Sequence, residues 1–220
     1  MTSSEQPQHG HVWSIVVGAG SGARFGGMKQ YETLGDTRVI DRSVSTARAV
    51  SDGVVVVVPA GDVEREGGIA GGASRSESVR NGLAHVPADA DIVCVHDAAR
   101  PFASTDLFEQ VIAAVRNGAD AAIPAVPVTD TIKIVASDGS GTVESTPDRS
   151  TLVAVQTPQA FAAVALRRAH ELDDGTSTAT DDAMLVERAG GVVVVVDGEG
   201  SNRKITTQDD LEWARREVEQ

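Results

Sequence analysis

The sequence predicts an α/β protein with a mostly parallel, twisted sheet and helices on both faces. Short apolar runs typical of buried strands alternate with longer segments whose apolar residues recur at helical spacing. The first apolar run, residues 12–17, ends abruptly in a glycine-rich loop. Because parallel strands present their carboxyl ends at one edge of a sheet, a ligand site is expected at that edge.

Composition and charge narrow the classes of protein to which the chain can belong. Its 220 residues suffice for one domain with a sizeable core, and 41% of them are hydrophobic, which argues against a disordered chain. The 19 basic and 32 acidic residues give a net charge of −13, which argues against nonspecific nucleic-acid binding. The single cysteine, Cys94, excludes an intrachain disulfide and is predicted to lie in the core.

No segment suggests secretion or membrane insertion. Residues 1–11 are polar, lack the apolar centre of a signal peptide and are predicted to form a disordered tail. No apolar run approaches the roughly 20 residues that a membrane-spanning helix requires. We therefore expect a cytoplasmic protein, with residues 12–220 forming one domain and no membrane partner.

In the first half of the chain the expected elements alternate regularly. Four runs rich in valine and alanine predict strands: 12–17, 53–58, 91–96 and 121–126. Three segments with apolar residues at helical spacing predict helices: 38–50, 74–86 and 104–117. Ser104 is the expected N-cap of the last of these helices, and Gly118 is its expected stop. The glycine-rich segment 61–72 is short and polar.

A polar segment interrupts this alternation in the second half of the chain. Residues 129–150 are mildly β-prone and centred on Ser-Asp-Gly-Ser-Gly, which predicts a hairpin arm projecting from the domain. A short apolar run at 153–155 follows, and a last strand is predicted over 192–196. Helices are predicted at three positions, the second with Thr180 as N-cap: 159–172, 180–189 and 208–219.

The loop after the first strand has the composition of an anion-binding turn. Glycine occupies every second position from Gly18 to Gly22, and glycine lets the backbone approach a ligand closely. Free N–H groups in such a turn bind phosphate, and the two cations that follow, Arg24 and Lys29, indicate a polyphosphate. The glycines and Ala23 also match the weak G-x-G-x-x-A dinucleotide fingerprint, and a tight turn without a ligand explains them too.

A carboxylate follows the strand predicted at residues 91–96. Asp97 stands at the carboxyl end of that strand, beside the glycine loop if the two strands are near neighbours. A lone carboxylate that faces a polyphosphate suits Mg²⁺, which takes one or two carboxylates plus phosphates. The structural alternative for Asp97 is a helix cap or an ion pair with Arg100.

Other polar residues are less distinctive when they are taken singly. Residues 71–78 join a double glycine to a helix start, where backbone groups and a hydroxyl could read a base edge or simply cap the helix. Arg149, Thr157 and Lys204 lie in segments that are not obvious solvated faces. Alone, each of these three is more often a surface residue than a site residue.

Taken together, these segments resemble the 2-C-methyl-D-erythritol 4-phosphate cytidylyltransferase family. The matches are collinear and extend over about residues 12–219. They comprise Gly-Ala-Gly-Ser-Gly-Ala-Arg at 18–24 with Lys-Gln-Tyr at 29–31, Gly-Gly-x-x-Arg-x-x-Ser at 71–78, His-Asp-Ala-Ala-Arg-Pro at 96–101, Asp-Thr-Ile-Lys at 130–133, Thr-Pro-Gln at 157–159, Thr-Asp-Asp-Ala at 180–183 and Asn-x-Lys-Ile-Thr at 202–206.

This resemblance implies a fold, a reaction and an assembly. The fold resembles that of nucleotide-diphospho-sugar transferases, with a seven-stranded mostly parallel sheet, flanking helices and a projecting β-arm. The reaction converts CTP and 2-C-methyl-D-erythritol 4-phosphate into the CDP-alditol and pyrophosphate, in the non-mevalonate isoprenoid route. Mg²⁺ or another divalent cation is the implied cofactor, and the implied assembly is a homodimer whose arms interlock.

The resemblance also carries over site residues one by one. Arg24 and Lys29 match the family's transition-state stabilisers, and Arg149 and Lys204 match the residues that position the alditol phosphate. Asp97 matches the metal-associated aspartate. The resemblance further implies that seven residues bind the nucleotide: Ala19, Gly20, Gly22, Gly72, Ser78, Asp97 and Thr131. Among them, Gly72 and Ser78 match the cytosine pocket, and Thr131 matches the threonine of the arm.

Two segments depart from the family pattern. The loop begins Val17-Gly18-Ala19-Gly20 instead of Pro-Ala-Ala-Gly, and the spacing from Arg24 to Lys29 is two residues short, with Met28 where a proline is usual. Residues 60–72 are also shorter than usual, enough to remove an edge strand or helix. The first departure bears directly on where the Lys29 ammonium can lie.

Three other functions stay open at this stage. A cytidylyltransferase for another alditol phosphate, such as ribitol 5-phosphate, would carry almost the same motifs. A nicotinamide-dependent oxidoreductase would use Gly18-x-Gly20-x-x-Ala23, but it wants an acidic residue at the end of the second strand, where Val58-Pro59-Ala60-Gly61 stands. A nucleotide-binding module without catalysis would not need the retained cations.

Overall fold

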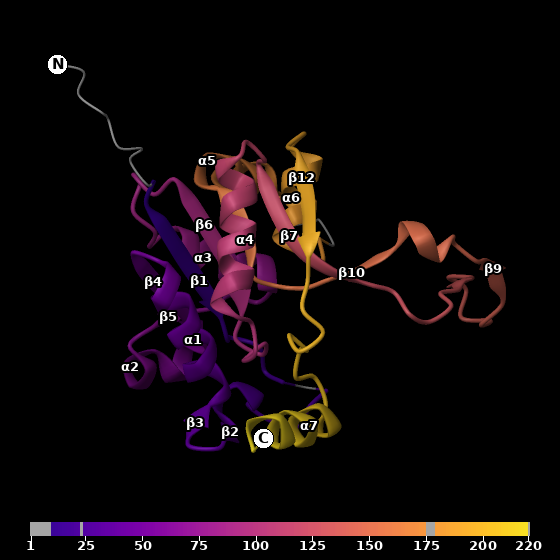
Figure 1. Cartoon of the computed structure of the whole chain (residues 1–220), viewed down its shortest axis with the longest axis horizontal. Helices are drawn as coiled ribbons and strands as arrows, with labels where there is room; N and C mark the ends of the chain where they lie inside the picture. The colour runs from indigo at the N-terminus through magenta and orange to yellow at the C-terminus, as the bar shows by residue number, and fades with distance from the viewer. Residues whose placement is uncertain (1–9, 23, 175–178, 220) are drawn as a thin grey trace.

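The computed structural model describes residues 10–22, 24–174 and 179–219, and it is built around an eight-stranded sheet with helices on both faces (Figure 1). Its strands are β1 Val12–Val17, β4 Gly53–Val58, β5 Ile69–Ala70, β6 Ile92–Asp97, β7 Ala121–Pro127, β10 Val153–Val155, β11 Gln159–Ala162 and β12 Val193–Asp197. The α/β class with a mostly parallel sheet is confirmed, because β1–β4, β1–β6, β4–β5 and β7–β12 all pair in parallel.

The strand count differs from the seven expected. Both β10 and β11 run antiparallel to β7, and their registers differ by two residues at the interruption formed by residues 156–158. That interruption contains the cis Thr157–Pro158 peptide bond. If β10 and β11 are counted as one interrupted strand, the sheet has the seven that were expected.

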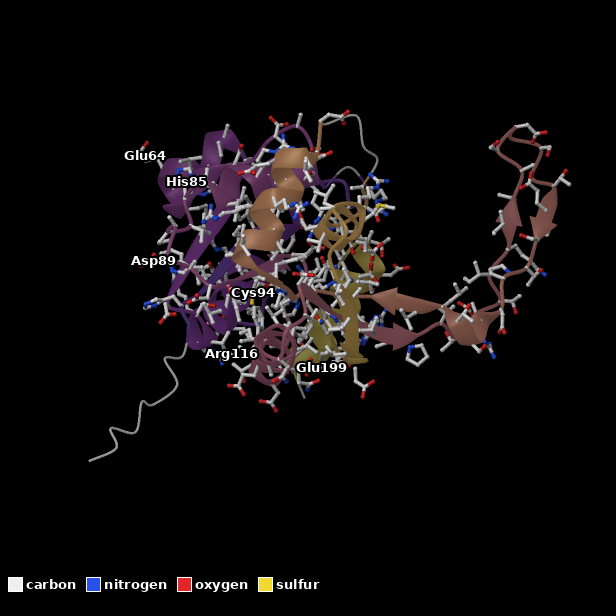
Figure 2. All side chains as sticks on the ribbon, turned by 90° about the horizontal axis from the view of Figure 1, so that it is seen from above. Glu64, His85, Asp89, Cys94, Arg116 and Glu199 are labelled. Atoms are coloured by element: carbon white, nitrogen blue, oxygen red, sulfur yellow. The ribbon has the colours of Figure 1, made fainter. Side chains whose placement is uncertain are left out.

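Helices cover both faces of the sheet because side chains alternate along each central strand. Val12, Val16 and Cys94 pack with residues of α1 (Val39–Val50) and α4 (Thr105–Arg116). Ile15 and Val95 point the other way, toward α3 (Arg75–Leu83), α5 (Ala163–Leu172) and α6 (Asp182–Arg188). Burial raises the pKa of the Cys94 thiol to about 12, in keeping with the predicted core residue (Figure 2).

Two helix predictions were wrong at their amino ends. Gln159–Ala162 is strand β11 and not the first turn of a helix, because it pairs with β6 on one side and β7 on the other. Helix α6 begins at Asp182, and its N-cap is Asp181 instead of Thr180, since the Asp181 carboxylate accepts the Met184 N–H at 3.0 Å. Pairing within the sheet and the local cap decided these boundaries.

The short segment 60–72 keeps the elements whose loss was expected. It contains the 3₁₀ turn Ala60–Asp62, helix α2 (Val63–Glu66) and the edge strand β5. The Tyr31 hydroxyl donates to Asp62 at 2.8 Å, and the Arg65 guanidinium lies 4.5 Å from the Tyr31 ring centroid. The two shortened segments therefore contact each other.

The segment predicted as an arm stands away from the sheet in both overall views (Figures 1 and 2). Its two short strands, β8 (Ile134–Val135) and β9 (Val143–Ser145), pair only with each other among the described residues.

The last helix, α7 (Gln208–Val218), packs on Phe25 and on Leu34 of the small β2–β3 hairpin (Thr33–Leu34 and Thr37–Arg38).

Within the described residues, no helix has both the length and the apolar character needed to cross a membrane. The predicted disordered tail, residues 1–11, falls outside the described part of the chain at residues 1–9, as does Ala23 of the glycine motif.

Candidate active site

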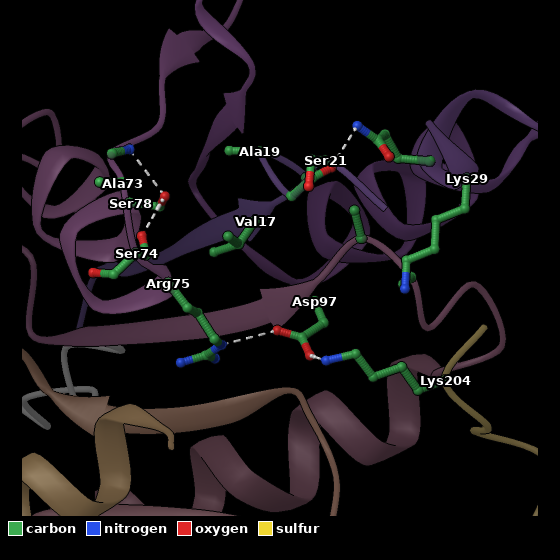
Figure 3. Close-up of a pocket in the computed structure, with 16 residues that line it drawn as sticks. Val17, Ala19, Ser21, Lys29, Ala73, Ser74, Arg75, Ser78, Asp97 and Lys204 are labelled. Carbon is green, nitrogen blue, oxygen red and sulfur yellow. Dashed lines mark hydrogen bonds and ion pairs between the residues drawn. The ribbon is translucent and has the colours of Figure 1, made fainter. Parts of the chain in front are cut away.

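Parallel pairing brings the two predicted site segments together. Strand β1 pairs with β6 so that Val17 lies opposite Asp97, and both strands end at the same edge of the sheet. A cleft of about 460 Å³ opens there (Figure 3). Seven of the predicted site residues line it: Ala19, Gly20, Lys29, Gly72, Ser78, Asp97 and Lys204.

The glycine loop presents unused donors to this cleft. The Gly18 N–H still belongs to the sheet, because it donates to the Val57 carbonyl at 2.7 Å. The next three residues, Ala19, Gly20 and Ser21, line the cleft and donate no backbone hydrogen bond to any described residue. Three consecutive free N–H groups at a strand end form the cradle that an anion requires.

Gly22 shapes this loop and is not among the residues that line the cleft. Its φ is +65°, and its carbonyl accepts the N–H groups of Phe25 and Gly26 at 2.8 and 2.9 Å. A Cβ at this position would lie 1.8 Å from the Gly27 carbonyl oxygen. Only glycine is compatible with both the backbone angle and this close approach.

Replacing Gly22 by alanine is therefore expected to destabilise the loop more than the same change at Gly26. Gly26 also has a positive φ, +86°, but a Cβ there would meet nothing within 4 Å. Gly26→Ala should cost about 1–2 kcal/mol from the left-handed backbone alone, and Gly22→Ala should cost more because the backbone must also move. Chemical denaturation of both variants measures the difference, and equal losses would contradict this account.

Ala73, Ser74 and Ser78 form the wall opposite Lys29, and Gly72 belongs to the same lining (Figure 3). The Ser78 hydroxyl donates to the Ser74 carbonyl at 2.8 Å and accepts the Gly72 N–H at 3.0 Å, so it fixes the segment that precedes α3. A Cβ at Gly71 would lie 2.2 Å from the Ala19 Cβ. Ala19 of the glycine loop therefore packs directly against Gly71, and only glycine at position 71 leaves room for this contact.

Asp97 lies at the centre of the cleft between two cations. Its Oδ2 accepts from the Lys204 ammonium at 2.5 Å, and its Oδ1 accepts from Arg75 Nε at 3.2 Å. Burial alone would raise the pKa of Asp97, but Arg75 and then Lys204 outweigh it and hold this pKa well below its usual range. The carboxylate is therefore ionised at neutral pH, and it pairs with these two residues instead of Arg100.

Lys29 reaches the cleft despite the shortened loop. It begins the 3₁₀ turn Lys29–Tyr31, and its ammonium donates to the Ile205 carbonyl at 2.6 Å. Burial, and then the charges of Lys204 and Arg24, lower the pKa of Lys29. Several cations held close together repel one another, and an anionic ligand would relieve this repulsion.

Four predicted site residues do not line the cleft. Besides Gly22, these are Arg24, which is exposed, and two residues of the arm region, Thr131 and Arg149. Arg149 donates to the Thr129 carbonyl at 2.6 Å and lines a separate cavity of about 660 Å³ at the base of the arm. Arg149 therefore lies apart from the residues that line the cleft of its own chain.

The sequence analysis gave no role to Arg75 or to Asp182, although both belong to matched motifs. Arg75 lines the cleft and connects Asp97 to Asp182, which accepts from Arg75 Nη1 at 2.6 Å. Their signals were the motifs Gly-Gly-x-x-Arg-x-x-Ser at 71–78 and Thr-Asp-Asp-Ala at 180–183. Neither motif indicated that the two residues meet, because only the tertiary structure buries Asp182 against Arg75.

Comparison with known proteins decides the family. The family model described as 2-C-methyl-D-erythritol 4-phosphate cytidylyltransferase (IspD) matches residues 12–220 of this chain. The chain belongs to the IspD family. The sequence resemblance is thus confirmed over the region that forms the sheet, the cleft and the arm.

Individual members of the IspD family match more than nine tenths of this chain. The chain is 46% identical to a 2-C-methyl-D-erythritol 4-phosphate cytidylyltransferase of Rhodococcus jostii, covering 96% of both chains. It is 40% identical to a bifunctional IspD/IspF enzyme of Nitratidesulfovibrio vulgaris, of which it covers 56%. The solved structure of the synthase from Anaerococcus prevotii superposes with a TM-score of 0.83 at 31% identity, covering 96% of this chain and 99% of that one.

Membership of the IspD family, a family of nucleotidyltransferases, disfavours the oxidoreductase alternative. Strand β4 ends at Val58, and no acidic residue follows directly. The nearest one, Asp62, accepts the Tyr31 hydroxyl outside the cleft. The match of Gly18, Gly20 and Ala23 to the dinucleotide fingerprint therefore does not indicate an oxidoreductase.

Proposed function

We propose that this protein transfers the cytidylyl group of CTP to 2-C-methyl-D-erythritol 4-phosphate. The products are 4-diphosphocytidyl-2-C-methyl-D-erythritol and pyrophosphate, in the non-mevalonate isoprenoid route. The observation that carries the proposal is the cleft itself, which is lined at the carboxyl ends of β1 and β6 by Lys29, Lys204 and three loop residues whose N–H groups donate to no described residue.

The chemistry explains why the cleft is built from cations and not from a general base. The attacking oxygen belongs to the alditol phosphate, which is already ionised at neutral pH. It forms a bond to the α-phosphorus of CTP, while the bond from that phosphorus to the bridging oxygen breaks and its electrons leave with pyrophosphate. The barrier therefore lies in bringing two anions together and stabilising the leaving charge, which oriented cations do.

Within this proposal the cations divide between the two substrates. Lys29, supported by the field of the exposed Arg24, stabilises the triphosphate and the departing pyrophosphate. Lys204, which donates to Asp97, positions the alditol phosphate for in-line attack. Ala19, Gly20 and Ser21 bind phosphate oxygens, while Gly72 and Ser78 border the base.

Asp97 fits a magnesium ion that is held mainly by nucleotide phosphates. It is ionised, and each of its oxygens has a second lone pair besides the one that Lys204 or Arg75 uses. The described residues contain no group of three or more His, Cys, Asp or Glu side chains that could hold a metal by themselves. When bound, Mg²⁺ would neutralise phosphate charge, and one carboxylate plus phosphates is a usual donor set for it.

The arm supports the proposal of a homodimer. Ile134, Val135 and Val143 are each about half exposed, at 49%, 52% and 52%, although they lie on a two-stranded ribbon. Such a ribbon is marginally stable alone and needs a surface to pack on. We propose that the arms of two chains interlock, so that Arg149 and Thr131 of one chain serve the cleft of the other.

An assay with two alditol phosphates tests the proposed function. Incubation with CTP and Mg²⁺ should release pyrophosphate with 2-C-methyl-D-erythritol 4-phosphate and much less with ribitol 5-phosphate. The reverse preference would identify the enzyme as a cytidylyltransferase for another alditol phosphate. If the protein binds CTP but releases no pyrophosphate with either acceptor, it is a nucleotide-binding module without catalysis.

Asp97→Asn is expected to raise the Mg²⁺ concentration needed for half-maximal activity and to lower kcat. The change is nearly isosteric, so the fold should persist, although Arg75 and Lys204 lose a charged partner. A magnesium titration measures the midpoint, and thermal unfolding measures the accompanying loss of stability. An unchanged midpoint with unchanged kcat would assign Asp97 to a structural ion pair.

A further inference from the structure

Beneath the cleft lies a carboxylate that the proposed reaction does not use. Asp182, in the first turn of α6, is 0% exposed and is not among the residues that line the cleft. Its Oδ2 accepts from Arg75 Nη1 at 2.6 Å, and His170 Nε2 lies 3.1 Å from its Oδ1. We infer that Asp182 is a positioning residue, which sets the orientation of Arg75 and through it leaves Asp97 free to accept a magnesium ion.

This inference deepens the proposed function and rests on it. Four alternating charges form a continuous series from the interior to the cleft, namely Asp182, Arg75, Asp97 and Lys204. The last three of them appear in a row across the floor of the cleft in Figure 3. Asp182 is the innermost member, so any influence that it has on substrates must pass through Arg75.

The planar guanidinium of Arg75 transmits the position of Asp182. Its Nη1 is held by Asp182 and its Nε by Asp97, while its buried Nη2 has no hydrogen-bond partner among the described residues. Because the guanidinium nitrogens form a rigid fork, Arg75 cannot turn toward Asp97 without leaving Asp182. In this orientation Arg75 donates a single hydrogen bond to Asp97, through Nε.

Without the negative charge of Asp182, Arg75 would have one carboxylate partner left. The fork could then rotate so that two nitrogens face Asp97, in the bidentate arrangement that arginine and carboxylate prefer. That arrangement uses lone pairs of Asp97 that a magnesium ion needs. Loss of the Asp182 charge also makes the net charge beneath the cleft more positive by one. This change disfavours binding of a cation and favours binding of the nucleotide phosphates.

Stability of α6 does not account for a charged residue at this position. Asp181 already caps the helix, and Ala183, Leu185 and Val186 supply its buried apolar contacts. Buried ion pairs can often be replaced by apolar residues without loss of stability. The charge of Asp182 is therefore explained better by what it does to Arg75.

Asp182→Asn tests this inference with little disturbance of packing. The new amide can still accept from Arg75 through its oxygen. His170 can accept from its nitrogen by a change of tautomer, since His170 Nδ1 has no partner within the described part of the chain. The control is Asp181→Ala on the neighbouring residue, which removes the helix cap and touches neither Arg75 nor Asp97.

Two titrations and a melting curve separate positioning from stability. Asp182→Asn should raise the Mg²⁺ midpoint at least several-fold, lower kcat, and leave KM for CTP equal or lower. The same midpoint shift should appear in Mg²⁺-dependent CTP binding by calorimetry, where no turnover is involved. Asp181→Ala should lower the melting temperature without moving the midpoint.

The inference is overturned if Asp182→Asn lowers only the melting temperature and leaves the magnesium midpoint within about twofold of wild type. If that variant does not fold, Arg75→Lys decides, because lysine keeps the charge and loses the fork; it should shift the midpoint in the same direction, and an unshifted midpoint would refute the model. A wild-type protein that neither binds CTP nor releases pyrophosphate would instead remove the proposed function itself.

Discussion

Lys29→Ala is expected to lower kcat by roughly 10²–10³, the range for loss of one oriented charge-stabilising donor. The Lys29 ammonium lies in the cleft, at the carboxyl ends of the strands, where the departing pyrophosphate would gain charge. Because this charge develops during the reaction, kcat should fall more than KM for CTP rises. Steady-state kinetics with saturating alditol phosphate measures both parameters.

The pH profile adds a signature that a merely structural lysine would lack. Burial and neighbouring cations lower the pKa of Lys29, so its charge is present below that value and is lost as pH rises through it. Activity should therefore decline on the alkaline side below about 10.4, the ordinary value for lysine. Lys29→Arg keeps a charge that does not titrate in this range, and it should extend the active range.

Arg24→Ala serves as the comparison for the same loop. Arg24 is exposed and is not among the residues that line the cleft, but its charge acts on Lys29. If Arg24 turns toward the triphosphate when CTP binds, its loss should also lower kcat by roughly 10²–10³. A kcat within about threefold of wild type for either variant would remove that residue from the catalytic set.

Mixing two inactive variants is expected to restore activity. Arg149→Ala and Lys204→Ala homodimers should each be nearly inactive, because each leaves a phosphate of the substrates without its cation. In a mixed dimer, one cleft carries both defects and the other combines intact Arg149 with intact Lys204. Random refolding of equal amounts should restore about one quarter of the wild-type sites, since half of the dimers are mixed and each has one intact cleft.

The structure motivates this experiment because the arm carries Arg149 to a cavity that is separate from the cleft of its own chain. Mixed dimers must be shown to form, for example with one variant carrying an affinity tag. Mixing Arg149→Ala with Arg149→Ala that carries the tag is the matched control, and it should stay inactive. If tagged mixed dimers form and no activity returns, the two residues act within one chain.

The sequence by itself determined the local elements and the chemistry of their ends. Runs such as 53–58 are too apolar and too short for anything but buried strands, and Ser104 marks a helix start through its own side chain. The glycines of residues 18–22 indicated a tight turn after the first strand, and Gly22 has the positive φ that a residue without a Cβ accepts. The collinear motifs identified the family before any contact was known.

Only the tertiary structure decided which of these residues meet. That Asp97 lies beside the glycine loop depends on β1 and β6 being parallel neighbours, which is a matter of pairing between segments 80 residues apart. Pairing with β6 and β7 likewise made residues 159–162 a strand, against their local pattern. Burial of Asp182 beneath Arg75 joins residues 107 apart in the chain, and no local rule specifies such a contact. Strand pairing and the burial of charges depend on residues far apart in the chain. The sequence therefore indicated which residues belong to the site, but not which of them contact each other.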